Sequence, residues 1–394
     1  MEPATGEATA IRIEARRDAV RLRDGLPFCG TVFATVRITL SVLAVLTVGA
    51  VHPPSSAGSG VAVPATAGWH NAIDGTERWD AGWFERIARD GYRPDDASAA
   101  FFPGYPLAIR GVTSVIPVSE ADAALVVSNV AFLGALVVLF ALTTFEFSTE
   151  TARRAVLLLA WFPASFFFLA PYSESMFLFT SLLTFWWARR RRWGPAAAAG
   201  FVAALTRSVG IFLVPALLLE AWSLDRRERP RAIAASLVPL LAPAAYAAYW
   251  FARAGDALRP FHAQDSWFRS LELPFVTLGN GLWLGISGIT DRRGIYWTVD
   301  VALTSVVLIA IALGWKRIPK PYLVYLLASL VLILSYPLPE RPLLSVPRFV
   351  AVLFPAFWAI AVLAKGWRFP VTLVSFGIGF AVLSIAFMNW GYIF

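Results

Sequence analysis

The sequence predicts an all-α polytopic membrane protein, and three observations support this fold class. Hydrophobic residues make up 58% of the 394 residues and charged residues only 15%, whereas soluble domains usually carry about 25% charged residues. Long apolar runs recur, and about 20 apolar residues cross the roughly 30 Å hydrocarbon core. Arg-rich loops alternate with polar, aromatic loops, as the positive-inside rule requires. We therefore expect about nine full spans plus one re-entrant pair, with the N-terminus in the cytoplasm.

The first part of the chain is predicted to be a cytoplasmic basic tail at residues 1–28, followed by a single transmembrane domain at 29–394. The first span covers residues 29–51. A signal peptide is the competing interpretation, because small residues follow the apolar run. The basic region in front is long for a signal peptide, which favours a retained anchor.

An outside loop at residues 52–121 is expected to contain a helix from about Ala81 to Gly91, followed by an apolar stretch at 101–116. The helix has one apolar face, so we expect it to lie along the membrane surface with Trp and Phe embedded. Asp80 opens this helix as an N-cap, as a ligand-facing carboxylate, or as both. Several aromatic residues are interpreted as membrane anchors in preference to sugar-stacking surfaces, namely Trp83, Phe84, Phe101, Phe102 and Tyr105.

The remaining apolar runs follow in order after this loop. Full spans are predicted at residues 123–142, 155–170, 176–188, 232–251, 296–315, 322–337, 349–364 and 371–390. A second outside loop at 252–274 is polar with interleaved aromatic residues, and 275–289 is expected to form a partial or surface-lying helix. The basic run Arg189–Arg192 is interpreted as an orientation anchor on the cytoplasmic side.

One apolar segment, residues 194–222, has basic loops on both sides and is interrupted by Arg207. Two short helices meeting near Arg207 would let it enter and leave on the same side. Such backbone is tolerated only where it is buried in protein or lines a wet cavity. An unpaired Arg at this depth costs about 2.5–3.5 kcal/mol, so we favour a buried anion or carboxylate partner over snorkelling.

With this orientation, several polar residues that are unusual for ordinary loops are predicted to lie at or near the outer face of the membrane. They are Asp80, Glu174, His262, Gln264, Arg269 and Arg348, with Arg207 pointing toward them from below. A carboxylate beside several arginines at the lipid–water boundary suits sugar transfer from a lipid-linked phosphosugar. Arginine matches phosphate geometry, and the carboxylate can take the proton of an acceptor hydroxyl.

Other classes of function have weaker support. The chain has no G-x-S-x-G, H-E-x-x-H or P-loop motif, and three His with one Cys do not favour a zinc site. The net charge of +8 is attributed to orientation arginines and anionic lipid, so no nucleic-acid partner is expected. A transporter or flippase of lipid-linked saccharides is the alternative function. It would require broken helices in both halves of the chain, and the only broken segment that the sequence indicates is the one at Arg207. A non-catalytic scaffold is the third.

Several side chains keep structural alternatives. Glu174 could cap the helix after Tyr172, and Arg348 could snorkel at the interface. His262 is interpreted as a surface residue rather than a base.

Five stretches together resemble a known family. The first is WDAGWFERIARDGY followed by FFPGYP; the others are WFPASFFFLAPYSESMFLF at 161–179, LTRSVGIFLVP at 205–215, FHAQDSWFR at 261–269 and SVPRFVAVLFP at 345–355. They are similar to PIG-V type mannosyltransferases of the GT-C superfamily, in the same order, from about residue 70 to the C-terminus.

The resemblance implies an inverting, metal-independent and cofactor-free mannosyltransferase with a GT-C-like helical bundle in the cell membrane. Its donor would be polyprenyl-phosphate-mannose, and its active site would be extracytoplasmic. The acceptor, whether glycolipid, glycan or protein, stays open. Asp80 takes the place of the catalytic acidic residue. Substrate-binding positions are matched by Trp79, Glu174, Arg207, Gln264, Trp267, Arg269 and Arg348.

This chain departs from the family pattern at one point. Many GT-C enzymes carry two adjacent acidic residues in the first loop, whereas here Asp80 is followed by Ala81. Any second carboxylate must therefore be Glu77, Glu85 or a distant residue.

Overall fold

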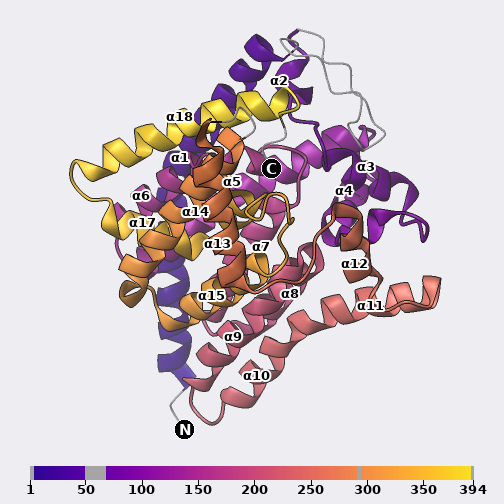
Figure 1. Ribbon diagram of the computed structural model, residues 1–394. Helices are drawn as coiled ribbons and strands as arrows, with labels where there is room; N and C mark the ends of the chain where they lie inside the picture. Colours follow the sequence, from indigo (N-terminus) through magenta and orange to yellow (C-terminus); the bar gives the residue numbers. More distant parts are fainter. Residues whose placement is uncertain (1–3, 49–67, 291–293, 392–394) are drawn as a thin grey trace.

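A bundle of helices makes up the part of the chain that the computed structural model describes, residues 4–48, 68–290 and 294–391 (Figure 1). These residues form no strand, and the only bridge recorded among them joins Leu338 and Arg341. The predicted all-α class is confirmed. Residues 52–67, the first part of the predicted outside loop, lie outside the described residues.

The first helix, α1 (Ala4–Thr47), runs without a break through Pro27, from the lower end of the bundle in Figure 1 to its top. Its apolar, span-like part is Arg23–Thr47. This helix continues across residue 28, and the predicted division into a cytoplasmic tail at 1–28 and a transmembrane domain from 29 stays a prediction.

Five described helices are long and apolar enough to cross a membrane by length and composition. Four of them are the apolar part of α1, α5 (Glu120–Glu146), α14 (Gly294–Gly314) and α18 (Arg368–Met388). The fifth, Arg229–Ala254, is made of α10 (Arg229–Leu237), η4 (Val238–Leu240) and α11 (Leu241–Ala254). Shorter apolar helices include α15 (Lys320–Leu334) and α17 (Phe354–Leu363). The chain is thus a multi-pass membrane protein, while the predicted number of about nine full spans stays a prediction.

The segment predicted as a span at 155–170 is not one helix. α6 (Thr149–Ala160) ends just before Pro163, and the 3-10 turn η2 (Ser165–Phe168) follows. Proline cannot continue the hydrogen-bonding pattern of a helix, so the chain breaks here. The three phenylalanines of η2 are buried in the core. This segment therefore forms part of the protein interior and leads directly into α7 (Glu174–Ala188).

The apolar segment 194–222 is broken at Arg207, as predicted. α8 (Trp193–Thr206) ends there, and η3 (Ser208–Phe212) leads into α9 (Leu213–Trp222). Arg207 itself has an extended backbone, φ −150° and ψ 146°. Gly210 permits the tight reversal, since a Cβ at that position would lie 2.5 Å from the Cα of Ala204.

The first loop contains α2 (Asn71–Asp74), α3 (Ala81–Asp90), η1 (Ala97–Ala100) and α4 (Gly104–Thr113). The prediction that α3 embeds its apolar face in the membrane is wrong. Phe84 is buried, with ring centroids 5.1 Å from Phe101, 5.0 Å from Tyr105 and 6.3 Å from Tyr172. The helical periodicity was sound, but the apolar face packs against protein.

The remaining short elements connect the longer helices. They are α12 (Arg259–His262), η5 (Ala263–Trp267), α13 (Pro274–Ser287), η6 (Gly288–Thr290), η7 (Trp315–Arg317) and α16 (Val346–Ala351). A buried ion pair joins α14 to the loop before α16, with Arg341 Nε donating to Asp300 at 2.6 Å. The sequence analysis did not predict this pair, although Asp300 lies inside the predicted span 296–315.

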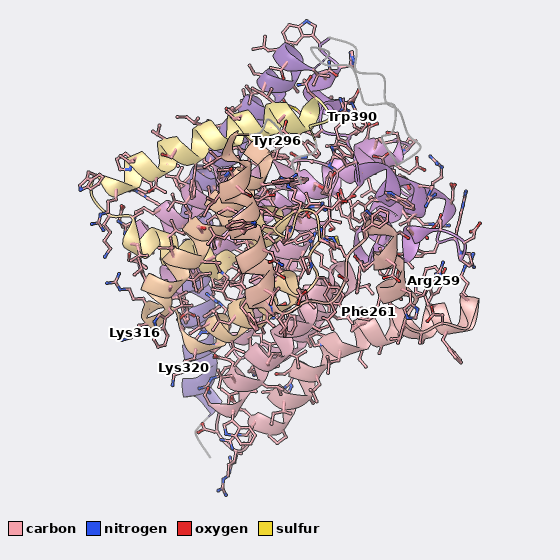
Figure 2. The ribbon with its side chains drawn as sticks, viewed as in Figure 1. Arg259, Phe261, Tyr296, Lys316, Lys320 and Trp390 are labelled. Atoms are coloured by element: carbon pink, nitrogen blue, oxygen red, sulfur yellow. The ribbon has the colours of Figure 1, made fainter. Side chains whose placement is uncertain are left out.

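Residues predicted to lie on opposite sides of the membrane occupy different parts of the molecule. Figure 2 shows Lys316 and Lys320 at the lower left of the bundle, Tyr296 and Trp390 near its top, and Arg259 and Phe261 toward its right. Arg189, from the predicted orientation anchor, forms internal ion pairs with Glu146 at 2.7 Å and Glu220 at 2.6 Å. Which end faces the cytoplasm stays a prediction.

Candidate functional site

A cavity of about 350 Å³ lies where the first loop, the break at Arg207, the second loop, α15 and α16 meet. These elements are distant in sequence, but together they place most of the predicted site residues in the wall of this one cavity. The predicted residues that line it are Trp79, Asp80, Arg207, Gln264, Trp267, Arg269 and Arg348. Glu174 does not line the cavity.

Asp80 occupies the N-cap position of α3, but its side chain makes no capping hydrogen bond. The capping interpretation is therefore wrong. Its Oδ2 instead accepts from Nη1 of Arg348 at 2.8 Å, and its side chain keeps 27% exposure, toward the cavity. The backbone amide of Asp80 donates to the hydroxyl of Tyr172 at 3.2 Å, and that hydroxyl donates to the carbonyl of Arg78 at 2.7 Å.

Glu174 is fully buried behind the two arginines of the cavity wall. Its Oε1 accepts from Nη1 of Arg207 at 2.6 Å and also from Nε of Arg348. The prediction that Arg207 has a buried carboxylate partner is confirmed, and the snorkelling alternative for Arg348 is wrong because that residue is buried. A direct substrate contact by Glu174 is not supported by this geometry, because the arginines lie between it and the cavity.

The site carries a surplus of positive charge. Two carboxylates, Asp80 and Glu174, stand against three guanidinium groups, those of Arg207, Arg269 and Arg348. Burial lowers the pKa of Arg348, but Glu174 and Asp80 more than offset this and hold the pKa above its ordinary value. Arg269 is oriented by the carbonyls of Tyr336, at 2.9 Å, and Leu344, at 3.4 Å. This arrangement suits an anion such as a phosphate.

Aromatic rings form another part of the cavity wall. Trp267 lies 5.6 Å from Phe101 between ring centroids, and Phe101 stacks on Trp83 at 5.4 Å. Interpreting these rings as membrane anchors is wrong for Phe84, Phe101 and Tyr105, which are buried in the protein.

Two other aromatic or polar predictions can be placed. Phe102 lines the cavity and packs 5.3 Å from Tyr246 between ring centroids. His262 is exposed, is hydrogen-bonded to Asp256 at 2.9 Å, and does not line the cavity, as predicted for a surface residue.

Backbone strain is concentrated beside the charged residues. Trp79, Phe268 and Ser345 have φ values of 54°, 55° and 66°, in the left-handed region that non-glycine residues rarely adopt. Trp79 and Phe268 directly precede Asp80 and Arg269. Such conformations cost about 1–3 kcal/mol each and persist only where the surroundings impose them. Sequence reasoning missed them because none of the three is a glycine.

Neither nearby candidate for a second carboxylate, Glu77 or Glu85, lines the cavity. Burial raises the pKa of Glu77 to about 7 and that of Glu85 to about 8. The second carboxylate at the site is instead Glu174, which touches Arg348 and not Asp80. Within the described ranges, no group of three His, Cys, Asp or Glu side chains is arranged to hold a metal ion.

Comparison with known proteins confirms the family resemblance. Residues 32–220 match the family described as mannosyltransferase (PIG-V). A stretch of 121 residues is 34% identical to GPI mannosyltransferase 2 of Drosophila pseudoobscura pseudoobscura, covering 28% of this chain and 26% of that protein. The match thus spans about a quarter of the curated relative's length.

Two solved structures resemble this chain to different degrees. ArnT from Cupriavidus metallidurans, bound to undecaprenyl phosphate, aligns with a TM-score of 0.50 at 14% identity over 93% of this chain and 77% of its own. The Archaeoglobus fulgidus oligosaccharyltransferase tethered to an acceptor peptide aligns with a TM-score of 0.47 at 14% identity, over 92% of this chain and 55% of its own. The similarity to ArnT supports the expected GT-C-like helical bundle and concerns the fold alone.

Proposed function

Starting from a chain that resembles the mannosyltransferase (PIG-V) family and has a GT-C-type membrane fold, we propose that it is a membrane glycosyltransferase. It moves mannose or a related sugar from a polyprenyl-phosphate donor to an acceptor hydroxyl, on the extracytoplasmic face of the cell membrane. The observation that carries this proposal is the meeting of Asp80 with Arg207 and Arg348 at the wall of one cavity.

The donor phosphate is bound by the arginines. Arg207 and Arg269 line the cavity, and each is oriented by protein acceptors, Glu174 for the first and backbone carbonyls for the second. Fixed guanidinium groups stabilise the negative charge that grows on the phosphate as it leaves. The apolar part of the lining, which includes Leu332, Ile333 and Val352, accommodates the first part of the lipid.

Asp80 acts as the general base. Its carboxylate takes the proton of the acceptor hydroxyl, the acceptor oxygen forms a bond to the anomeric carbon, and the bond from that carbon to the phosphate oxygen breaks. The electron pair of that bond leaves with the polyprenyl phosphate. Arg348 donates a hydrogen bond to Oδ2 of Asp80. This contact orients the carboxylate toward the acceptor hydroxyl.

The sugar binds between the charged and aromatic parts of the wall. Phe101 and Trp267 present ring faces or edges, and Gln264 supplies an amide that can donate to and accept from hydroxyl groups. Such a mixed surface suits a saccharide, which has both apolar C–H faces and hydroxyls. The acceptor is glycolipid, glycan or protein.

The proposal is tested with purified protein in liposomes that contain labelled polyprenyl-phosphate-mannose and a membrane extract as acceptor. Labelled product is expected from the lipid donor and not from GDP-mannose. Product formed equally well from GDP-mannose, or none from any lipid-linked sugar, would overturn the proposal. Movement of the intact donor across the bilayer without product would favour the transporter alternative, to which the family similarity gives no support.

A further inference from the structure

The far end of the chain contacts the residues that lead into Asp80. The last turn of α18 supplies the carbonyl of Met388, which accepts from Nε of Arg78 at 3.0 Å. The ring of Trp390 lies 5.0 Å from the guanidinium carbon of Arg78 and 5.6 Å from the ring of Trp79, edge to face. Figure 2 shows Trp390 at the top of the bundle, at the end of α18.

Arg78 is a buried cation, with 2% exposure, that ties this turn to the first loop. Its Nη1 donates to the carbonyls of Glu77 at 2.8 Å and Asp74 at 3.3 Å, while its Nε reaches Met388. Removing this side chain would therefore release both the first loop and the end of α18. Its own carbonyl accepts from Tyr172, so the backbone on the other side is held as well.

Trp79 needs such support because its φ of 54° is in the left-handed region. A strained residue stays in place only where its neighbours determine its conformation. Here the ring of Trp390 packs on one side of the strained step, and the hydroxyl of Tyr172 bonds the backbone of Arg78 and Asp80 on the other. The conformation of Trp79 sets the direction in which Asp80 leaves the turn.

The turn that holds Trp390 is itself well fixed. Trp390 is buried with 4% exposure and has a φ of 63°. The amide of Gly391 donates to the carbonyl of Ala386 at 2.7 Å and closes the turn. Trp390 does not line the cavity.

From these contacts we propose that the turn of residues 388–391, through Trp390, is a positioning element for the base Asp80. It holds the Arg78–Trp79 step in the strained conformation that aims the Asp80 carboxylate at Arg348 and into the cavity. This inference rests on the proposed transferase function. Trp390 itself contacts no substrate, so its effect is on the turnover step and not on donor binding.

The test compares Trp390→Ala with Trp367→Ala, which removes an exposed tryptophan (73%) at the other end of the same helix. Misplacing a reacting group by about 1 Å costs roughly 100-fold, so Trp390→Ala should lower kcat roughly 10- to 100-fold. KM for the lipid donor should change little, because Arg207 and Arg269 are untouched. Trp390→Phe keeps a ring against Trp79 and should restore most of kcat.

A second readout does not depend on transfer. The chain has one cysteine, Cys29, which is buried, so Asp80→Cys introduces a single reactive thiol at the site. Its labelling rate by a water-soluble maleimide should change severalfold when Trp390→Ala is added, and should not change with Trp367→Ala. Should Trp390→Ala fail to accumulate, Trp390→Leu, which fills the space without a ring, carries the same expectation.

The outcomes separate the two proposals. Equal kcat and equal labelling in the Trp390 and Trp367 variants would overturn the positioning role. A parallel loss of kcat and rise of KM, without rescue by Trp390→Phe, would also overturn it and indicate a merely structural residue. If the wild type transfers no sugar, the proposed function fails, while the labelling rates still decide whether Trp390 positions residue 80.

Discussion

Arg348 donates from Nη1 to Oδ2 of Asp80 at 2.8 Å, joining residues 268 positions apart in the sequence. The same guanidinium donates from Nε to the buried carboxylate of Glu174. The direction of Arg348 is therefore set from behind by Glu174, and Arg348 in turn orients Asp80. Glu174, Arg348 and Asp80 form a chain of alternating charges that runs from the core to the cavity.

Replacement of Asp80 by asparagine tests the end of this chain. Asparagine keeps an oxygen that can accept from Arg348 but cannot take a proton, so transfer should fall about 10²- to 10⁴-fold, as for loss of a general base. The measurement is transfer from labelled lipid donor in membranes, at equal protein level. Asp90→Asn on the same helix, where Asp90 pairs with surface arginines, serves as the control. Wild-type activity of Asp80→Asn would exclude Asp80 as the base.

Replacement of Glu174 by glutamine tests the buried end. The change removes the negative charge that faces Arg207 and Arg348, and leaves the buried Arg348 and the 14% exposed Arg207 without their shared partner. Breaking a buried ion pair in this way costs about 3–5 kcal/mol, so thermal unfolding in detergent should move to clearly lower temperature. Glu150→Gln is the matched control, because Glu150 is 68% exposed and its contact with Arg154 is long, at 3.9 Å. Equal unfolding temperatures for the two variants would contradict the central role of Glu174.

The sequence predicted one part of this arrangement, the buried partner of Arg207, because an unpaired arginine inside an apolar segment is energetically costly. The basic loops on both sides of residues 194–222 predicted the break near Arg207. The partner could not be named with certainty, because Glu174 reads equally well as the first residue of a helix. Hydrophobic periodicity likewise predicted α3, but it does not say whether protein or lipid covers the apolar face.

Contacts between distant segments left no local signal. Arg78 and Met388 are 310 residues apart, and Asp300 with Arg341 joins a span to a loop. Asp300, inside the predicted span 296–315, calls for a partner in the way that Arg207 does, but no sequence pattern identifies Arg341 as that partner or Met388 as the partner of Arg78. Most of the predicted residues that line the cavity fall in polar, aromatic stretches of the predicted outside loops, and Arg207 interrupts an apolar segment. Of the residues that hold them in place, Glu174 was among the predicted site residues, whereas the contacts of Arg78 and Tyr172 could be recognised only from the folded structure.

Lysine substitutions separate the roles of the two arginines at Glu174. Lysine has a compact ammonium and lacks the planar fork of arginine, so at position 348 it cannot hold both Asp80 and Glu174. Arg348→Lys should mainly lower kcat, and Arg207→Lys should mainly raise KM for the lipid donor. Each effect should be about 10- to 100-fold, since a hydrogen bond to a charged group contributes about 1.5–3 kcal/mol.

The readout for these variants is steady-state transfer over a range of donor concentrations. Arg89→Lys controls for general effects, because Arg89 is an exposed residue paired with Asp90 on the surface. If both cavity variants raise KM and leave kcat unchanged, Arg348 binds the donor and does not orient the base.

Glu85 predicts a pH dependence of stability that is opposite to the usual behaviour of a carboxylate. It lies on α3, and burial, with a smaller contribution from Glu77, raises its pKa from 4.5 to about 8. Well below pH 4.5, the carboxyl is protonated in both the folded and the unfolded chain. As the pH rises further, the unfolded chain releases its proton while the folded chain retains it, so folding becomes less favourable. The loss is complete near pH 8, where the folded carboxyl also ionises.

Thermal unfolding in detergent between about pH 5 and pH 9 should therefore show falling stability for the wild type. Glu85→Gln removes the group that must ionise in a buried setting, so its stability should depend less on pH and exceed that of the wild type near pH 9. Glu150→Gln, at an exposed position, should follow the wild-type curve. Since α3 carries Asp80 at its first turn, Glu85→Gln should also preserve transfer activity at alkaline pH. A stability that rises with pH in the wild type, or a Glu85→Gln curve parallel to it, would show that Glu85 ionises freely in the folded protein.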